Sequence, residues 1–294
     1  MRLTGLRPEN PLAFMAAYGT LRLLPGARLR WAETHPELDY DGDAIADLVA
    51  LLPARRRSPE LNLVDDPREK HVKKAGGFAA LAQQMPHEWL TAYCAETAGG
   101  IAHTQLRVGP GDYTMIRAAR TVISVLANTD VADRVEEALL GPWRYVDLGA
   151  GFALGWDANA RQDRAVLAAE PKPRGKDKPV ILAANWLAWE AIPAWQMINA
   201  RTPGIEAADK KAGRLKRWTY ATCAEWLSWE GARALVLGWA RMPTHELRAT
   251  GVRVWQSEII GRAEAGEFGL ARTLSYRETA RGSRKMQVPD VLIV

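Results

Sequence analysis

The first helix that the sequence predicts is marked at both ends, and this constrains the fold more than any other feature. A strand-like run over residues 2–6 is followed by Asn10, a favoured N-cap residue. Pro11 then occupies the first helical position, where its missing N–H costs nothing. The apolar helical stripe ends at Pro25-Gly26. We therefore predict a short strand and then a helix between these two signals.

Gly19 lies inside this predicted helix, where glycine costs about 1 kcal/mol relative to alanine. Such a residue indicates that another segment packs closely against the helix at this point. The stretch carries no obvious catalytic group. We therefore interpret the helix as a docking element.

The rest of the chain mixes helical and strand signals without a regular βαβ rhythm, which favours an α+β fold of short strands and helices. Asp43 and Asp130 are predicted to cap two further helices. The 294 residues allow one large domain or two smaller ones. We expect an N-terminal α+β region over 1–140, with a basic, proline-rich loop near 53–74, and a tryptophan-rich α+β region over 141–294. One continuous domain is the alternative.

The sequence has no apolar run long enough to span a membrane and no signal-peptide pattern at its start. Its two cysteines, Cys94 and Cys223, are far apart and imply no disulfide framework. These features predict a cytoplasmic protein in a reducing compartment.

The formal net charge is +5, and the positive residues gather in segments that read mostly as loops. Basic loops suit contact with a phosphate backbone, although any one cluster can be an ordinary solvated surface. The candidate nucleic-acid-binding residues are Arg55, Arg56, Arg57, Lys73, Lys74, Lys172, Arg174, Lys176, Lys178, Lys210, Lys211, Arg214, Lys216 and Arg217.

Two short segments are nearly identical, Ala184 to Glu190 and Ala224 to Glu230. Each has two tryptophans three residues apart, Trp186/Trp189 and Trp226/Trp229, which lie on one face of a predicted helix. We expect both pairs to pack in the core. Aromatic stacking platforms or an internal duplication are the alternatives.

Asp157, Asp163, Glu170 and Lys172 resemble the residue set of a metal-dependent nuclease, which uses carboxylates to hold Mg²⁺ and activate water. Pro171 separates the last two and fits poorly in a central strand, because it removes a ladder hydrogen bond. The histidines and cysteines show no zinc-ligand spacing. We therefore predict no enzymatic activity, no cofactor and no metal, and keep the nuclease as an alternative.

Three stretches of the chain resemble a known family: residues 5–24, residues 141–147 leading to 155–157, and residues 184–188. They are similar to subunits encoded with type I CRISPR-Cas systems, especially type I-G. The resemblance implies a non-catalytic part of a crRNA-guided surveillance complex (Cascade) in antiviral defence. Such subunits bind crRNA ends, recognise the PAM duplex or hold the displaced strand.

The sequence therefore predicts a nucleic-acid-binding subunit of a ribonucleoprotein complex. Its expected partners are crRNA, target DNA and other effector-complex proteins, with no membrane. Lysine and arginine would contact phosphates, and exposed aromatic residues could stack on bases. The alternatives are the nuclease and a protein-only scaffold whose basic loops contact acidic partners.

Overall fold

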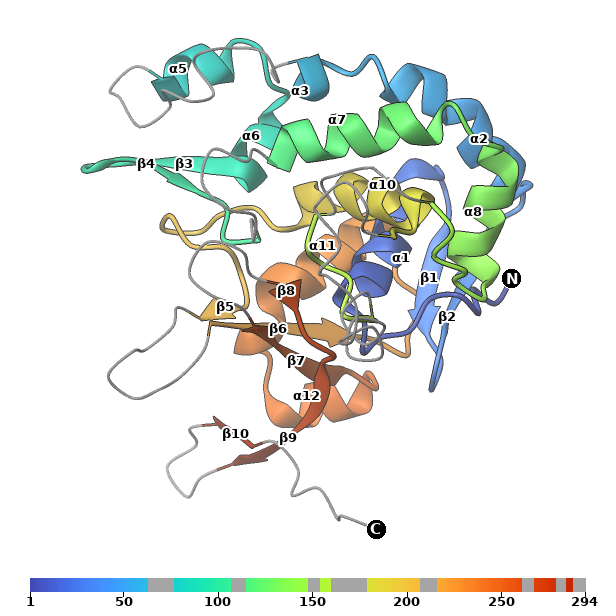
Figure 1. Cartoon of the computed structure of the whole chain (residues 1–294). Helices are drawn as coiled ribbons and strands as arrows, with labels where there is room; N and C mark the ends of the chain where they lie inside the picture. Colours follow the sequence, from blue (N-terminus) through green and yellow to red (C-terminus); the bar gives the residue numbers. More distant parts are fainter. Residues whose placement is uncertain are drawn as a thin grey trace, which may run out of the picture.

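The computed structural model describes residues 1–62, 77–106, 115–147, 154–159, 179–206, 216–260, 267–278 and 284–287. Helices and small sheets intermix in an irregular α+β arrangement (Figure 1), which confirms the predicted fold class. The strand pairs in these ranges are all antiparallel.

The helical elements are α1 (Pro11–Leu23), α2 (Ala44–Arg55), α3 (Pro59–Asn62), α5 (Gly77–Ala82), α6 (His87–Tyr93), α7 (Met115–Leu126), α8 (Val131–Leu140), α10 (Leu182–Glu190), η4 (Ile192–Ala194), α11 (Trp229–Gly238), η5 (Trp239–Arg241) and α12 (Thr244–Ala249). The strands are β1 (Arg28–Trp31), β2 (Pro36–Asp39), β3 (Cys94–Thr97), β4 (Gly100–His103), β5 (Ile205–Glu206), β6 (Arg217–Thr222), β7 (Arg253–Ile260), β8 (Glu267–Phe268), β9 (Arg272–Glu278) and β10 (Arg284–Gln287). Two hairpins, β1–β2 and β3–β4, accompany a larger sheet in the order β10-β9-β7-β6-β5, with β8 on β7.

Helix α1 forms the centre of the molecule. The side chain of Asn10 accepts a hydrogen bond from the backbone N–H of Leu12 at 3.0 Å, which confirms the predicted cap. Gly19 faces α10 so closely that a Cβ there would lie 2.6 Å from the carbonyl carbon of Leu187. This contact confirms the prediction that another segment packs closely against the helix at Gly19. All of α1 except Arg22 is buried, and the segment that packs against it is α10 of the same chain.

The core is continuous across the boundary near residue 140, since one cluster of buried residues draws from both sides of it. Helices α7, α8 and α1 all contact α10, with α7 above it and α8 beside it in the view of Figure 1. On the sheet side of α1, Phe14 stacks on Tyr220 of β6 with ring centroids 4.2 Å apart. The order from one side to the other is therefore α7, then α10, then α1, then the sheet, with α8 at the side of this stack (Figure 1).

The two tryptophan pairs differ. Trp186 and Trp189 are fully buried in α10, which confirms the core prediction for this pair. Helix α11 begins only at Trp229, because Ser228 caps it by accepting from the N–H of Gly231 at 3.3 Å. Trp226 precedes the helix, so the expectation of one shared helix face is wrong for the second pair.

The segment around Trp226 is extended because it covers the free edge of β1. The N–H of Leu29 donates to the carbonyl of Leu227 at 2.8 Å, and the reverse bond is equally short. On the opposite edge of this hairpin, Arg2 forms an isolated bridge to Glu37 of β2. This bridge takes the place of the strand predicted over residues 2–6.

Candidate functional site

A pocket of about 290 Å³ opens beside the start of α1. Its walls come from the segment that leads into α1, from the segment that follows α8 and from residue 159. We call it the N-terminal pocket. The side chains most relevant to its chemistry are Thr4, Arg7, Asn10, Trp143, Tyr145 and Asn159.

The first two walls meet where Gly5 crosses the end of α8. The N–H of Gly5 donates to the carbonyl of Leu139 at 2.9 Å. A Cβ on Gly5 would lie 2.7 Å from the nitrogen of Gly141 and 2.8 Å from the carbonyl oxygen of Ala138. These atoms are backbone and cannot rotate aside, so the approach requires glycine at this position.

The third wall is held by Asn10. Its side-chain Nδ2 donates to Oδ1 of Asp157 at 2.9 Å, while the N–H of Leu12 donates to the carbonyl of Trp156 at 3.0 Å. Asp157 Oδ1 also accepts from the N–H of Asn159 at 2.9 Å. Asn10 therefore caps the central helix and fixes the pocket wall at the same time.

Two aromatic side chains line the pocket. Trp143 and Tyr145 are half-buried and meet edge to face, with ring centroids 6.2 Å apart. The indole N–H of Trp143 donates to the carbonyl of Ala138 at 3.1 Å, which fixes the ring. Tyr145 has a φ of 54°, a left-handed conformation that costs a non-glycine residue about 1–2 kcal/mol. Such strain persists only where the surrounding structure enforces it, often at a ligand site.

Arg7 is the charged residue in the lining of the pocket. The side chain of Arg7 is 60% exposed, and its ion pair with Glu9 has an N–O distance of 3.7 Å. Burial lowers the pKa of the nearby His35, and the cations Arg7 and Arg2 lower it further. The carboxylate of Glu9 acts in the opposite direction on the pKa of His35, so both charges of the Arg7–Glu9 pair act on this histidine.

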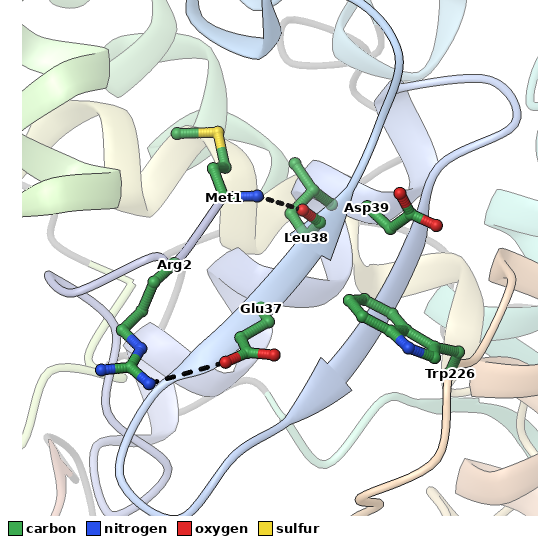
Figure 2. Close-up of a pocket in the computed structure, with 6 residues that line it drawn as sticks. All are labelled: Met1, Arg2, Glu37, Leu38, Asp39 and Trp226. Carbon is green, nitrogen blue, oxygen red and sulfur yellow. Dashed lines mark hydrogen bonds and ion pairs between the residues drawn. The ribbon is translucent and has the colours of Figure 1, made fainter.

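A second hollow, of about 390 Å³, lies against the β1–β2 hairpin and includes Trp226 (Figure 2). Its charges are paired, because Arg30 donates to Glu37 at 2.8 Å and Arg28 pairs with Asp39. The Arg30 guanidinium also lies 4.6 Å from the centroid of the Trp226 ring. The N-terminal pocket differs from this hollow in having two aromatic side chains, Trp143 and Tyr145, in its lining.

Five of the predicted basic residues fall in the described part of the chain. Arg56 and Arg57 are exposed at the end of α2. Arg217 pairs with Glu258 at 3.0 Å. Lys216 is half-buried, its Nζ donates to the carbonyl of Gln105 at 2.6 Å, and burial lowers its pKa. Lys73, Lys74, Lys172, Arg174, Lys176, Lys178, Lys210, Lys211 and Arg214 lie outside the described residues.

Arg55, the fifth, belongs to a buried ion cluster that the sequence analysis missed. Its Nε lies 2.8 Å from Oε1 of Glu190, and it also pairs with Glu60. Arg22 of α1 lies 2.8 Å from the other oxygen of Glu190. Burial raises the pKa of Glu190, and Arg55 and Arg22 oppose that rise. We therefore assign Arg55 a structural role, joining α2 to α1 and α10.

The proposed nuclease residues are mostly outside the described ranges, which omit Asp163, Glu170 and Lys172. Asp157 is 8% exposed, and its carboxylate organises the pocket wall through the bonds given above. Within the described ranges, no group of three or more acidic, histidine or cysteine side chains has the arrangement of a metal site.

Comparison with known proteins adds no family to these observations. Neither a protein-family model nor a curated protein sequence matches the chain. In the part of the chain that the structure describes, every helix is too short or too polar for a bilayer crossing.

Proposed function

We propose that this protein is a non-catalytic, nucleic-acid-binding subunit of a crRNA-guided surveillance complex. The observation that supports it best is that the stretches with the family resemblance lie next to one another in the structure. Residues 5–24 and 141–147 both line the N-terminal pocket, Asp157 of the stretch 155–157 is bonded to Asn10 behind its wall, and residues 184–188 lie in α10 against Gly19. Segments that share a resemblance and also share a site are expected to serve one function.

Charge and surface chemistry support nucleic acid as the ligand. The chain carries a formal net charge of +5, and Arg56 and Arg57 stand exposed at the end of α2. Guanidinium groups bind phosphate with two parallel hydrogen bonds, while aromatic side chains stack on unpaired bases. In this proposal the protein holds crRNA or target DNA and contacts neighbouring protein subunits. A separate nuclease cuts the target.

The test is a salt titration of binding between the purified full-length chain and single-stranded RNA, single-stranded DNA and duplex DNA. The logarithm of the binding constant should fall linearly with the logarithm of salt concentration, with a slope of about −0.7 to −0.9 for each phosphate contact. A flat response, or no binding either alone or in the assembled complex, would refute the proposal.

Charge reversal at Arg56 and Arg57 tests whether these two arginines contact the phosphates of the nucleic acid. The double variant Arg56→Glu/Arg57→Glu should weaken binding and reduce the magnitude of the salt slope by about 2. The control Arg201→Glu/Arg241→Glu changes the net charge equally at two other exposed arginines. Equal weakening in both variants would mean that the effect comes from total charge and that Arg56 and Arg57 make no specific contact.

Nuclease digestion of the purified complex distinguishes the proposed nucleic-acid-binding role from that of a protein-only scaffold. In our proposal, digestion of crRNA and DNA should weaken the attachment of this subunit. Attachment that survives digestion, together with no binding to nucleic acid, would instead favour a scaffold.

A further inference from the structure

We propose that the N-terminal pocket binds one unpaired nucleotide, with its base against Trp143 and Tyr145 and its phosphate on Arg7. The inference rests on the proposed function and assigns a specific site to it. RNA and DNA both offer an unpaired base and a phosphate, and the experiment below compares the binding of the two.

The size of the pocket limits its ligand to about one nucleotide. Its volume of about 290 Å³ is just below that of pockets for drug-sized ligands, which run from about 300 to 1,000 Å³. A single base can enter such a space, whereas a stacked base pair in a duplex cannot. The pocket therefore selects a nucleotide that is unpaired or at the end of a strand.

The aromatic walls provide a stacking surface of fixed orientation. The Trp143 ring cannot rotate freely, because its N–H is bonded to Ala138 at 3.1 Å. Tyr145 is held beside it in a strained backbone conformation with φ at 54°. A base that stacks on a preorganised ring gains affinity without the cost of ordering that ring.

Polar groups complete the site. The half-buried amide of Asn159 can hydrogen-bond the edge of an unpaired base. Asn10 is 2% exposed, and its amide is already bonded to Asp157 and to the N–H of Leu12, so it serves to hold the wall in place. Asp157 accepts from the N–H of Asn159 as well, which fixes the backbone of the residue that faces the base.

Arg7 supplies the phosphate contact. Its present partner Glu9 is 3.7 Å away, and both side chains are solvent-accessible, at 60% and 32% exposure. Exposed ion pairs of this kind contribute little to stability. A phosphate can therefore replace the Glu9 carboxylate at small cost and gain a bidentate contact with the guanidinium.

The experiment measures binding of the full-length chain to eight-nucleotide single strands of RNA and of DNA. Each strand carries 2-aminopurine at one end, and the fluorescence of this base falls when it stacks. The variants are Trp143→Ala and Arg7→Ala. The matched control is Trp226→Ala, which removes a second half-buried tryptophan in the other hollow. Circular dichroism checks that each variant is folded.

Trp143→Ala should weaken binding by about 5- to 150-fold and abolish the fluorescence change, because one stacking contact is lost. Arg7→Ala should weaken binding and reduce the magnitude of the salt slope by about 1, and this exposed residue keeps the test valid if Trp143→Ala does not fold. Trp226→Ala should bind as the wild type does. Tighter binding of one strand type identifies it as the ligand.

The two proposals fail in different ways. If the wild type binds single strands while Trp143→Ala and Arg7→Ala bind equally well, the pocket assignment is wrong and the proposed function stands. If the wild type binds no nucleic acid in any assembly, the proposed function fails and the pocket assignment fails with it.

Discussion

Substitution of Gly19 by alanine tests the central packing of the fold. A Cβ at this position would lie 2.6 Å from the carbonyl carbon of Leu187 and closer still to its oxygen. Atoms in ordinary contact lie about 3.5–4.0 Å apart, and the oxygen is the nearer obstacle, so α1 and α10 would have to separate by about 2 Å. The obstructing atoms are backbone, and no side-chain rotation can relieve the clash.

The expected magnitude follows from two opposing effects. Overpacking typically costs about 1–3 kcal/mol and costs more where the backbone must move. Alanine recovers about 1 kcal/mol through its higher helix propensity. Because the backbone must move here, the overpacking cost is expected to exceed the usual upper value of about 3 kcal/mol. With about 1 kcal/mol recovered, the Gly19→Ala substitution should lower the free energy of unfolding by at least about 2 kcal/mol.

Urea denaturation followed by circular dichroism measures this change, with Gly238→Ala as the control. A Cβ on Gly238, at the end of α11, meets no atom within 4 Å. That variant should be as stable as the wild type or up to about 1 kcal/mol more stable. If Gly19→Ala proves as stable as Gly238→Ala, the close contact between α1 and α10 does not exist.

Three further predictions concern buried and paired groups. Glu190→Gln should cost about 3 kcal/mol in urea denaturation, because it leaves two largely buried arginines without their shared carboxylate; unchanged stability would contradict this. Burial raises the pKa of the Cys94 thiol to about 12, so a thiol reagent at pH 8 should label Cys94 only after unfolding; rapid labelling of this residue in the native protein would count against its burial. A hydrogen bond from Arg30 lowers the pKa of Glu37 below its ordinary 4.5, so this pair stabilises the protein above that pH and ceases to do so as the pH falls through the folded value. The melting temperature should therefore fall less on acidification in Glu37→Gln than in the wild type, and an identical fall would contradict the pairing.

Local signals made parts of the fold predictable. Asn10, Asp43 and Asp130 each cap a helix as expected, because an N-cap bonds to backbone groups two or three residues away. Gly19 also allowed a prediction from local sequence. Glycine lowers the stability of a helix, so its presence inside one indicates that a neighbouring segment leaves no room for a side chain. In both cases the signal lies within the element that it describes.

The remaining features depend on contacts between distant segments. The short charged strand β2 and the extended stretch around Trp226 are defined by pairing with β1, which no local pattern encodes. The role of Arg55 was missed because its partner Glu190 is 135 positions away. The N-terminal pocket likewise depends on a hydrogen bond between Asn10 and Asp157, residues 147 positions apart.

Ultraviolet cross-linking of the full-length protein to single-stranded RNA and DNA, with the adducts mapped by mass spectrometry, tests the central claim most directly. We expect cross-linked nucleotides on the peptide that contains Trp143 and Tyr145, and their loss when excess unlabelled single strand competes. Cross-links confined to other peptides would contradict the pocket assignment, and the absence of any cross-link would contradict nucleic-acid binding itself.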